Sequence, residues 1–88
     1  MISLTSKNVE EFLCLDNDTR ELTFTSEFLN WLSDYGIRVD IQLNISGMKF
    51  QVSCQKIMDG CTIGSHSIIG IDLIFRSEED EMLFRLTY

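Results

Sequence analysis

The sequence contains no proline, one histidine, one tryptophan and three cysteines among its 88 residues. It has no apolar run near the ~20 residues of a membrane-spanning helix. Its N-terminal stretch also lacks the basic start and apolar core of a secretory signal peptide. We therefore expect a cytoplasmic protein that does not span a membrane. A chain of this length has room for one hydrophobic core, so residues 1–88 are predicted to form a single domain.

Basic residues are scarce, because seven Lys and Arg residues stand against fourteen Asp and Glu residues, which gives a net charge of −7. Such a surface is repelled by nucleic acid phosphates and by anionic membranes. The charge thus disfavours direct nucleic acid binding. It favours a protein partner with a basic surface, or it serves solubility alone.

The cysteines, Cys14, Cys54 and Cys61, are odd in number, which favours reduced thiols over a disulfide framework. Cys54, Cys61 and His66, with Asp59 among them, come closest to a metal-binding set. Zinc ligands usually come in pairs two to four residues apart, whereas here six and four residues intervene. We expect no metal and no other cofactor.

His66 lies between Ser65 and Ser67, which brings a base and two hydroxyls together in the sequence. Adjacent residues cannot easily turn a hydroxyl toward a neighbouring imidazole and also supply an oxyanion hole. The sequence also has no G-x-S-x-G nucleophile elbow and no glycine-rich phosphate loop. It therefore predicts a protein that is not an enzyme.

Residues 37–56 are predicted to form a β-hairpin that turns at Ser46 and Gly47. One face of this hairpin is apolar and the other is polar, and a slip of one residue would mismatch both faces. The apolar pairs are Ile45–Met48, Leu43–Phe50, Ile41–Val52 and Val39–Cys54, and the polar pairs are Asn44–Lys49, Gln42–Gln51, Asp40–Ser53 and Arg38–Gln55.

A helix is predicted at about 26–35, capped by Thr25 or Ser26 and ended by Gly36. Its apolar residues recur at helical spacing, and the chain passes directly from it into the hairpin. We therefore expect this helix to pack on the apolar face of the hairpin and to bury Phe50 there.

The remaining segments complete an α+β domain. The tail alternates like a strand, but Ser77 followed by acidic residues favours a helix at about 78–86. The other expected elements are a short helix at about 7–13 capped by Ser6, a brief strand at 21–24, a loop at 57–67, and a strand at 67–75 with Ile69, Ile71, Leu73 and Phe75 on its inner side. The predicted architecture is a three- to four-stranded antiparallel sheet with the helices 26–35 and 78–86 packed on one face.

Two surfaces are candidate partner-binding sites. The outer face of the hairpin is rich in amides and poor in charge, as the centres of protein interfaces are, although an ordinary solvated sheet face has the same pattern. The acidic start of the last helix could mimic nucleic acid for a basic partner, although compensation of the helix dipole explains it equally well. The candidate residues are Gln42, Asn44, Gln51, Ser53 and Gln55 on the first surface, and Glu78, Glu79 and Glu81 on the second.

The ending F-R-S-E-E-D-E-M-L-F-R-L at residues 75–86 resembles the strand-to-acidic-helix endings of small acidic accessory proteins of tailed bacteriophages. This resemblance implies a protein of the host cytoplasm that inhibits a host protein by occluding its functional surface. It points to no individual family and assigns no functional residue. The alternative is a structural or assembly subunit that forms a homodimer or larger oligomer through a sheet edge or the polar sheet face.

Overall fold

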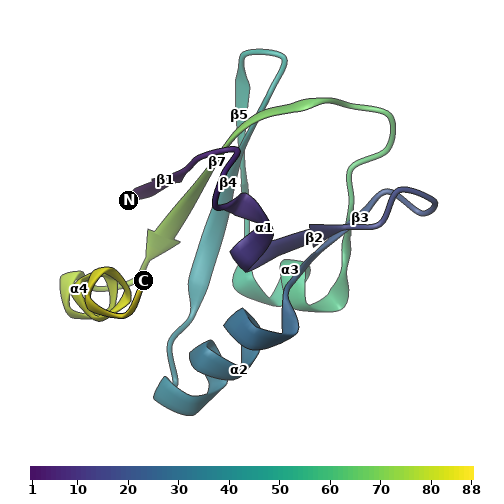
Figure 1. The fold of residues 1–88 in the computed structure, drawn as a ribbon. Helices are drawn as coiled ribbons and strands as arrows, with labels where there is room; N and C mark the ends of the chain where they lie inside the picture. Colours follow the sequence, from purple (N-terminus) through teal and green to yellow (C-terminus); the bar gives the residue numbers. More distant parts are fainter.

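Two antiparallel sheets and four helices make up the computed structural model, which describes residues 1–88 (Figure 1). The four-stranded sheet has the order β1-β7-β4-β5, and the three-stranded sheet has the order β2-β3-β6. The predicted α+β class is confirmed. The elements are β1 (Ile2–Leu4), α1 (Val9–Phe12), β2 (Leu13–Leu15), β3 (Glu21–Phe24), α2 (Ser26–Tyr35), β4 (Val39–Ile45), β5 (Met48–Val52), α3 (Cys54–Asp59), β6 (Cys61–Thr62), β7 (Ile68–Phe75) and α4 (Glu78–Thr87).

The β4–β5 hairpin has the predicted turn and register from Ile41 to Val52. Ser46 and Gly47 have φ angles of 52° and 80°, and two successive positive φ angles match the twist of a two-residue hairpin. The confirmed pairs are Ile45–Met48, Asn44–Lys49, Leu43–Phe50, Gln42–Gln51 and Ile41–Val52.

The predicted extension of this hairpin to Lys56 is wrong, because α3 begins at Cys54. The Ser53 hydroxyl accepts a hydrogen bond from the Lys56 amide at 3.2 Å, and the Asp40 carboxylate accepts one from the Cys54 amide at 3.0 Å. These two bonds satisfy amides of the first helical turn and so stabilise a helix there. The pairs Val39–Cys54, Asp40–Ser53 and Arg38–Gln55 are therefore absent, and the expected loop at 57–67 contains the end of α3 and all of β6.

The ends of α2 and α4 follow the sequence signals. The Thr25 hydroxyl accepts the Phe28 amide at the start of α2, and Gly36 ends the helix with a left-handed φ of 63°. The Ile37 amide then donates to the Leu32 carbonyl at 2.9 Å, which closes the last turn. At α4 the Ser77 hydroxyl accepts the Asp80 amide at 3.2 Å, so the tail is helical as predicted.

The N-terminal third differs from the expectation of a helix at about 7–13. The helix α1 contains only four residues, its N-cap is Asn8 rather than Ser6, and the chain leaves it at Leu13 to form β2. In β2, Leu13 pairs with Phe24 and so becomes buried in the core. The strand β1 also had no clear signal in the sequence and pairs with β7.

A β-bulge changes the inner face of β7. Asn44 pairs with Gly70 whereas Ile45 pairs with Ile68, so Ile69 is an extra residue without a partner on β4. Ile69 is 66% exposed, and its predicted inward position is wrong. Leu73 is fully buried on the inner side, as predicted.

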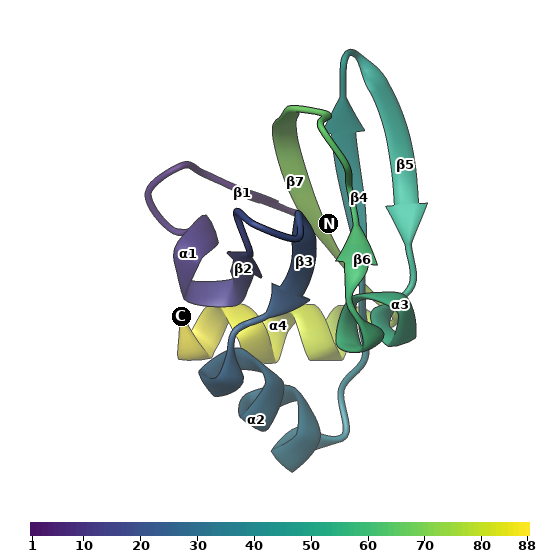
Figure 2. The same ribbon diagram turned by 90° about the vertical axis from the view of Figure 1, so that its right-hand side faces the viewer.

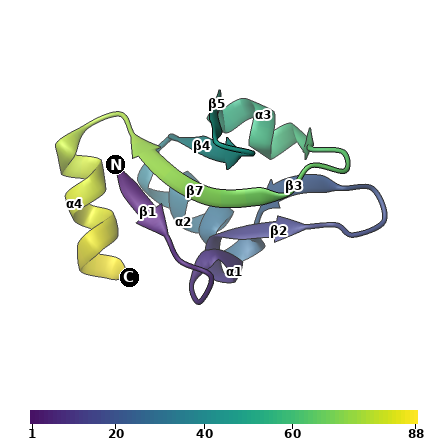
Figure 3. The ribbon, with the colours of Figure 1, turned by 90° about the horizontal axis from the view of Figure 1, so that it is seen from above.

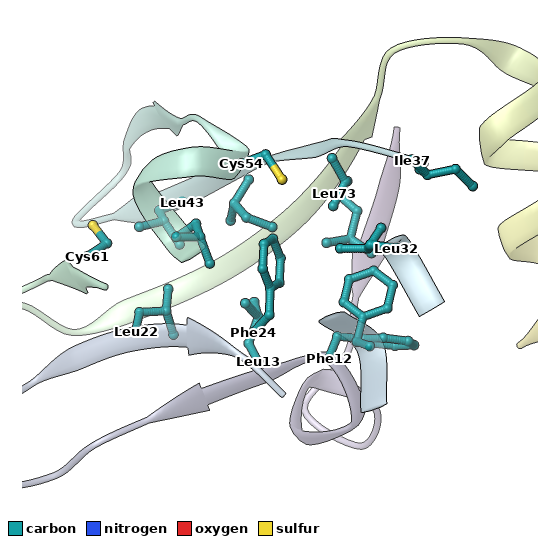
Figure 4. Packing of buried hydrophobic residues seen from close by; sticks show 14 of the residues in the cluster. Phe12, Leu13, Leu22, Phe24, Leu32, Ile37, Leu43, Cys54, Cys61 and Leu73 are labelled. Carbon is teal, nitrogen blue, oxygen red and sulfur yellow. The ribbon is translucent and has the colours of Figure 1, made fainter. Parts of the chain in front are cut away.

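The core lies between the two sheets and is closed by helices. Figure 4 shows Leu22 and Phe24 of the three-stranded sheet pointing toward Leu43 and Leu73 of the four-stranded sheet. Phe28 of α2 is fully buried at the centre of an aromatic cluster. Phe84 of α4 joins the same cluster, with its ring centroid 5.9 Å from that of Phe28 and 5.2 Å from that of Phe75.

Candidate functional site

The predicted amide-rich surface is only partly present. Gln42 and Asn44 lie on the central strand β4 and are half-buried, while Gln51 lies opposite Gln42 on β5 and is exposed. The Gln51 side-chain amide donates to the carboxylate of Asp40 at 3.3 Å. These residues therefore share the outer face of the four-stranded sheet.

Ser53 and Gln55 belong to α3 instead of the sheet, and each of them has a local partner. Ser53 is the N-cap, and the Gln55 side chain accepts from the Arg38 guanidinium at 3.1 Å and donates to the Asp59 carboxylate at 3.0 Å. Their polar groups stabilise the helix and its junction with the segment that precedes β4. They do not continue the amide row of the sheet.

The acidic candidates lie at the other end of the chain, on the first turn of α4. Glu78 and Glu79 are exposed, whereas Glu81 forms an ion pair with the N-terminal ammonium group of Met1 and a second, longer one with Arg85 at 3.9 Å. The hydrogen bond from the ammonium group lowers the pKa of Glu81. Glu81 thus fixes the N-terminus against α4, and two of the three acidic candidates have exposed carboxylates.

The most unusual surface is the free edge of β5, which the sequence did not reveal. β5 is the last strand of its sheet, and Figures 2 and 3 show it at the margin of the molecule. Met48 is 63% exposed and Phe50 is 45% exposed, although both face the inner side of the sheet. The predicted burial of Phe50 is therefore wrong. Val39 and Ile41 on the neighbouring strand β4 are fully buried, so the elements that cover the inner side of the sheet do not enclose its last strand.

The main chain of β5 alternates between paired and free groups. In a two-residue hairpin the residues that flank the turn form a hydrogen-bonded pair, and every second pair after it is also hydrogen-bonded. Met48, Phe50 and Val52 therefore bond to β4, while the N–H and C=O groups of Lys49 and Gln51 point away from it. We call this strand edge, with the side chains of Met48 and Phe50 and the main chain of Lys49 and Gln51, the docking edge.

A groove of about 370 Å³ runs beside the docking edge. Met48 and Phe50 form one side of it, and Ile63 and His66, which follow β6, form part of the other side. Leu43 lies at the buried base of the groove. An apolar groove next to free main-chain groups can receive an extended peptide, whose backbone pairs with the strand while alternate side chains enter the groove.

Arg20 holds the far side of this groove in place. Its guanidinium donates to the carbonyl of Gly64 at 2.8 Å and to that of His66 at 3.2 Å, and its own carbonyl accepts the Ile63 amide at 3.0 Å. Arg20 also has a positive φ of 59°, which is uncommon for a residue other than glycine. No sequence signal indicates this role, because the hydrogen-bonded residues lie more than forty positions apart.

The cysteines are free thiols. Cys54 and Cys61 are buried, which confirms the predicted inward position of Cys54, and Cys14 is exposed. His66 is exposed beside the groove. The structure contains no cluster of three or more histidine, cysteine, aspartate or glutamate side chains that could hold a metal ion.

None of the four helices combines the length and the apolar character that crossing a membrane requires. In comparisons with known proteins, no family model, no curated protein and no solved structure matches the chain.

Proposed function

We propose that the protein is a non-enzymatic protein-binding module that contacts its partner through the docking edge. The observation that supports this proposal is the pair of exposed apolar side chains, Met48 and Phe50, on a strand with an unpaired edge. Aromatic residues and methionine are enriched at protein interfaces. A strand edge adds directional hydrogen bonds to such apolar contacts, which favours binding of another protein over an ordinary solvated surface.

The expected mode of binding is strand addition. An extended segment of the partner would pair with the free main-chain groups of Lys49 and Gln51 and place alternate side chains in the groove beside Phe50. In such a complex, the main chain of β5 covers one edge of the partner's segment along its whole paired length. A small module that binds in this way acts by occlusion, as an inhibitor does, and the resemblance to phage accessory proteins supports the same mode of action.

The acidic residues have a different part in this proposal. Twelve of the fourteen acidic residues lie outside residues 36–71, whereas Lys49 lies on the docking edge itself. A distant charge of this sign accelerates the encounter with a basic partner without forming the contact. Reversing the charge of Glu78 and Glu79 should therefore slow association, while changes at the docking edge should accelerate dissociation.

Capture of partners from a bacterial lysate tests the proposal with a matched pair of variants. Met48 on the docking edge and Met82 on α4 are exposed to 63% and 62%, so Met48→Lys and Met82→Lys introduce the same change at equal exposure. We expect the wild type and Met82→Lys to retain the same proteins, and Met48→Lys to lose them. Equal retention by both variants would move the interface away from β5.

A further inference from the structure

We infer that the docking edge binds a second copy of this chain, so that two β5 strands pair antiparallel about a two-fold axis through Phe50. The inference rests on the proposed function, because it uses the same docking edge, and it assigns a second copy to that edge when no foreign partner occupies it. In such a dimer the two four-stranded sheets join into one sheet, and each β5 ceases to be an edge. The argument depends on the order of residues in β5, on its free main-chain groups and on the distribution of charge.

The sequence of β5, M-K-F-Q-V, is complementary to itself when it is reversed about its central residue. With the axis at Phe50, Met48 lies opposite Val52 of the second copy and Lys49 lies opposite Gln51. Apolar residues then meet apolar residues on the inner side, and the lysine meets a neutral amide on the outer side. All five residues of β5 have a partner in this arrangement.

Other positions of the axis fit less well. An axis at Lys49 would bring two lysines directly opposite each other, which is unfavourable across an antiparallel pair. An axis at Gln51 would place Lys49 opposite Ser53, where the strand has ended and the Ser53 hydroxyl caps α3. The axis at Phe50 alone avoids the like-charge pair and keeps every contact within the strand.

The free main-chain groups agree with the same axis. Lys49 and Gln51 direct their N–H and C=O groups away from β4, and in this register Lys49 of one copy faces Gln51 of the other. Facing residues with outward main-chain groups form hydrogen-bonded pairs, one on each side of the axis. The two Phe50 residues then form a pair without main-chain bonds, in which side chains approach most closely, so their rings can contact across the axis.

The charge of the chain also favours this surface for self-association. Two copies that each carry −7 repel one another unless they meet through a part with little charge. Residues 36–71, which contain β4, β5 and α3, carry three basic and two acidic residues, whereas the rest of the chain carries four basic and twelve acidic residues. Pairing through β5 brings together the nearly neutral parts of the two copies. The acidic helix α4 follows β7, and β4 separates β7 from β5.

The oligomeric state across a wide concentration series, measured by sedimentation equilibrium, tests the inference. We expect a dimer for the wild type and for Met82→Lys, and a monomer for Met48→Lys. Gln51→Pro should also be monomeric, because it removes an N–H group that points away from β4 and leaves the hairpin bonds intact. Far-UV circular dichroism and cooperative melting check that each variant is folded.

Cross-linking tests the register in a Cys14→Ser background, which removes the exposed native thiol. Two cysteines at position 50 would lie directly opposite each other, at a Cα separation of about 4.5 Å that a disulfide can span. Two cysteines at position 49 would each lie opposite position 51 and remain too far apart. Mild oxidation should therefore cross-link Phe50→Cys and leave Lys49→Cys as a single chain. Equal cross-linking of both variants would overturn this register.

The outcomes separate this inference from the proposed function. A wild type that stays monomeric at every concentration overturns the dimer, and so does a dimer that Met48→Lys and Gln51→Pro both leave intact. If the wild type is monomeric but Met48→Lys still loses captured proteins, the docking edge binds a different partner and the proposed function stands. If capture is also unchanged, both are wrong.

Discussion

Replacing Phe28 by alanine is expected to destabilise the fold by about 3–5 kcal/mol, the range for truncating a fully buried phenylalanine. Phe28 has no exposed surface, and its ring lies at the centre of the aromatic cluster. The cavity cannot close easily, because the surrounding rings belong to α1, β3, α2, α4 and the C-terminal residue. Their centroids lie at 5.0 Å for Phe12, 5.6 Å for Phe24, 6.0 Å for Trp31, 5.9 Å for Phe84 and 6.2 Å for Tyr88.

The matched comparison is Phe50→Ala, the same truncation on the docking edge. Phe50 keeps 45% of its surface exposed, so its removal loses about half of the 1.5–3 kcal/mol transfer free energy of a buried side chain, or about 1 kcal/mol. No enclosed cavity forms, because the groove beside it is open. The two phenylalanines should therefore differ by at least about 2 kcal/mol in their effect on the free energy of unfolding.

Urea unfolding followed by far-UV circular dichroism measures both changes. Tryptophan fluorescence is less suitable, since the ring of Trp31 stacks on Phe28 and its signal would change with the substitution itself. The measurement belongs at low protein concentration, where the proposed dimer is dissociated, and the m-value should stay unchanged. A cost for Phe50→Ala equal to that for Phe28→Ala would refute the exposed position of β5.

Three further predictions concern single sites. Gly36→Ala should cost about 1 kcal/mol in thermal melts, because a left-handed φ of 63° strains any side chain even where no atom lies within 4 Å. Arg20→Met should speed amide hydrogen exchange at residues 63–67 and leave exchange in β4 unchanged, because it removes the donors that hold this loop. Burial, and then the nearby carboxylates on α1 and α2, raises the pKa of Tyr88 above its ordinary 10.0, so the neutral phenol is favoured in the fold. The stability that Tyr88 contributes should be fully present below pH 10 and should be lost as the pH rises through its raised pKa. Tyr88→Phe should remove that loss.

The sequence predicted those parts of the fold that depend on neighbouring residues. The β4–β5 register follows from a turn and from pairs that are close along the chain, and the ends of α2 and α4 follow from Thr25, Gly36 and Ser77. Each of these signals is complete within a few residues. No distant segment has to be placed before the local structure is determined.

The errors arose where two local structures compete or where a distant segment decides. Leu13 fits the end of a helix as well as the start of a strand, and its pairing with Phe24 in β3 decides for the strand. Ser53 continues the alternation of β5, but its hydroxyl and the Asp40 carboxylate cap α3 more favourably. The exposure of Ile69 depends on a bulge that only the pairing with β4 creates.

The candidate site shows the same division. Sequence reasoning found the amide row of Gln42, Asn44 and Gln51, because these residues alternate within one hairpin. It placed Phe50 in the core, because the apolar face of a hairpin is normally covered. Which strand of a sheet becomes its edge depends on the pairing of β7 with the other side of β4, and that pairing is not visible in the sequence of the hairpin.

The three other outer strands of the two sheets provide a comparison that bears on the function of β5. An exposed strand edge invites aggregation, and proteins usually shorten their edge strands or cover them. Here β1 and β2 have three residues each and β6 has two, whereas β5 has five residues and exposes both Met48 and Phe50. Only Lys49 opposes unwanted pairing on this strand, and the two-fold register with Gln51 accommodates it. A long apolar edge in a protein whose other edges are short is best explained by a contact that the edge makes.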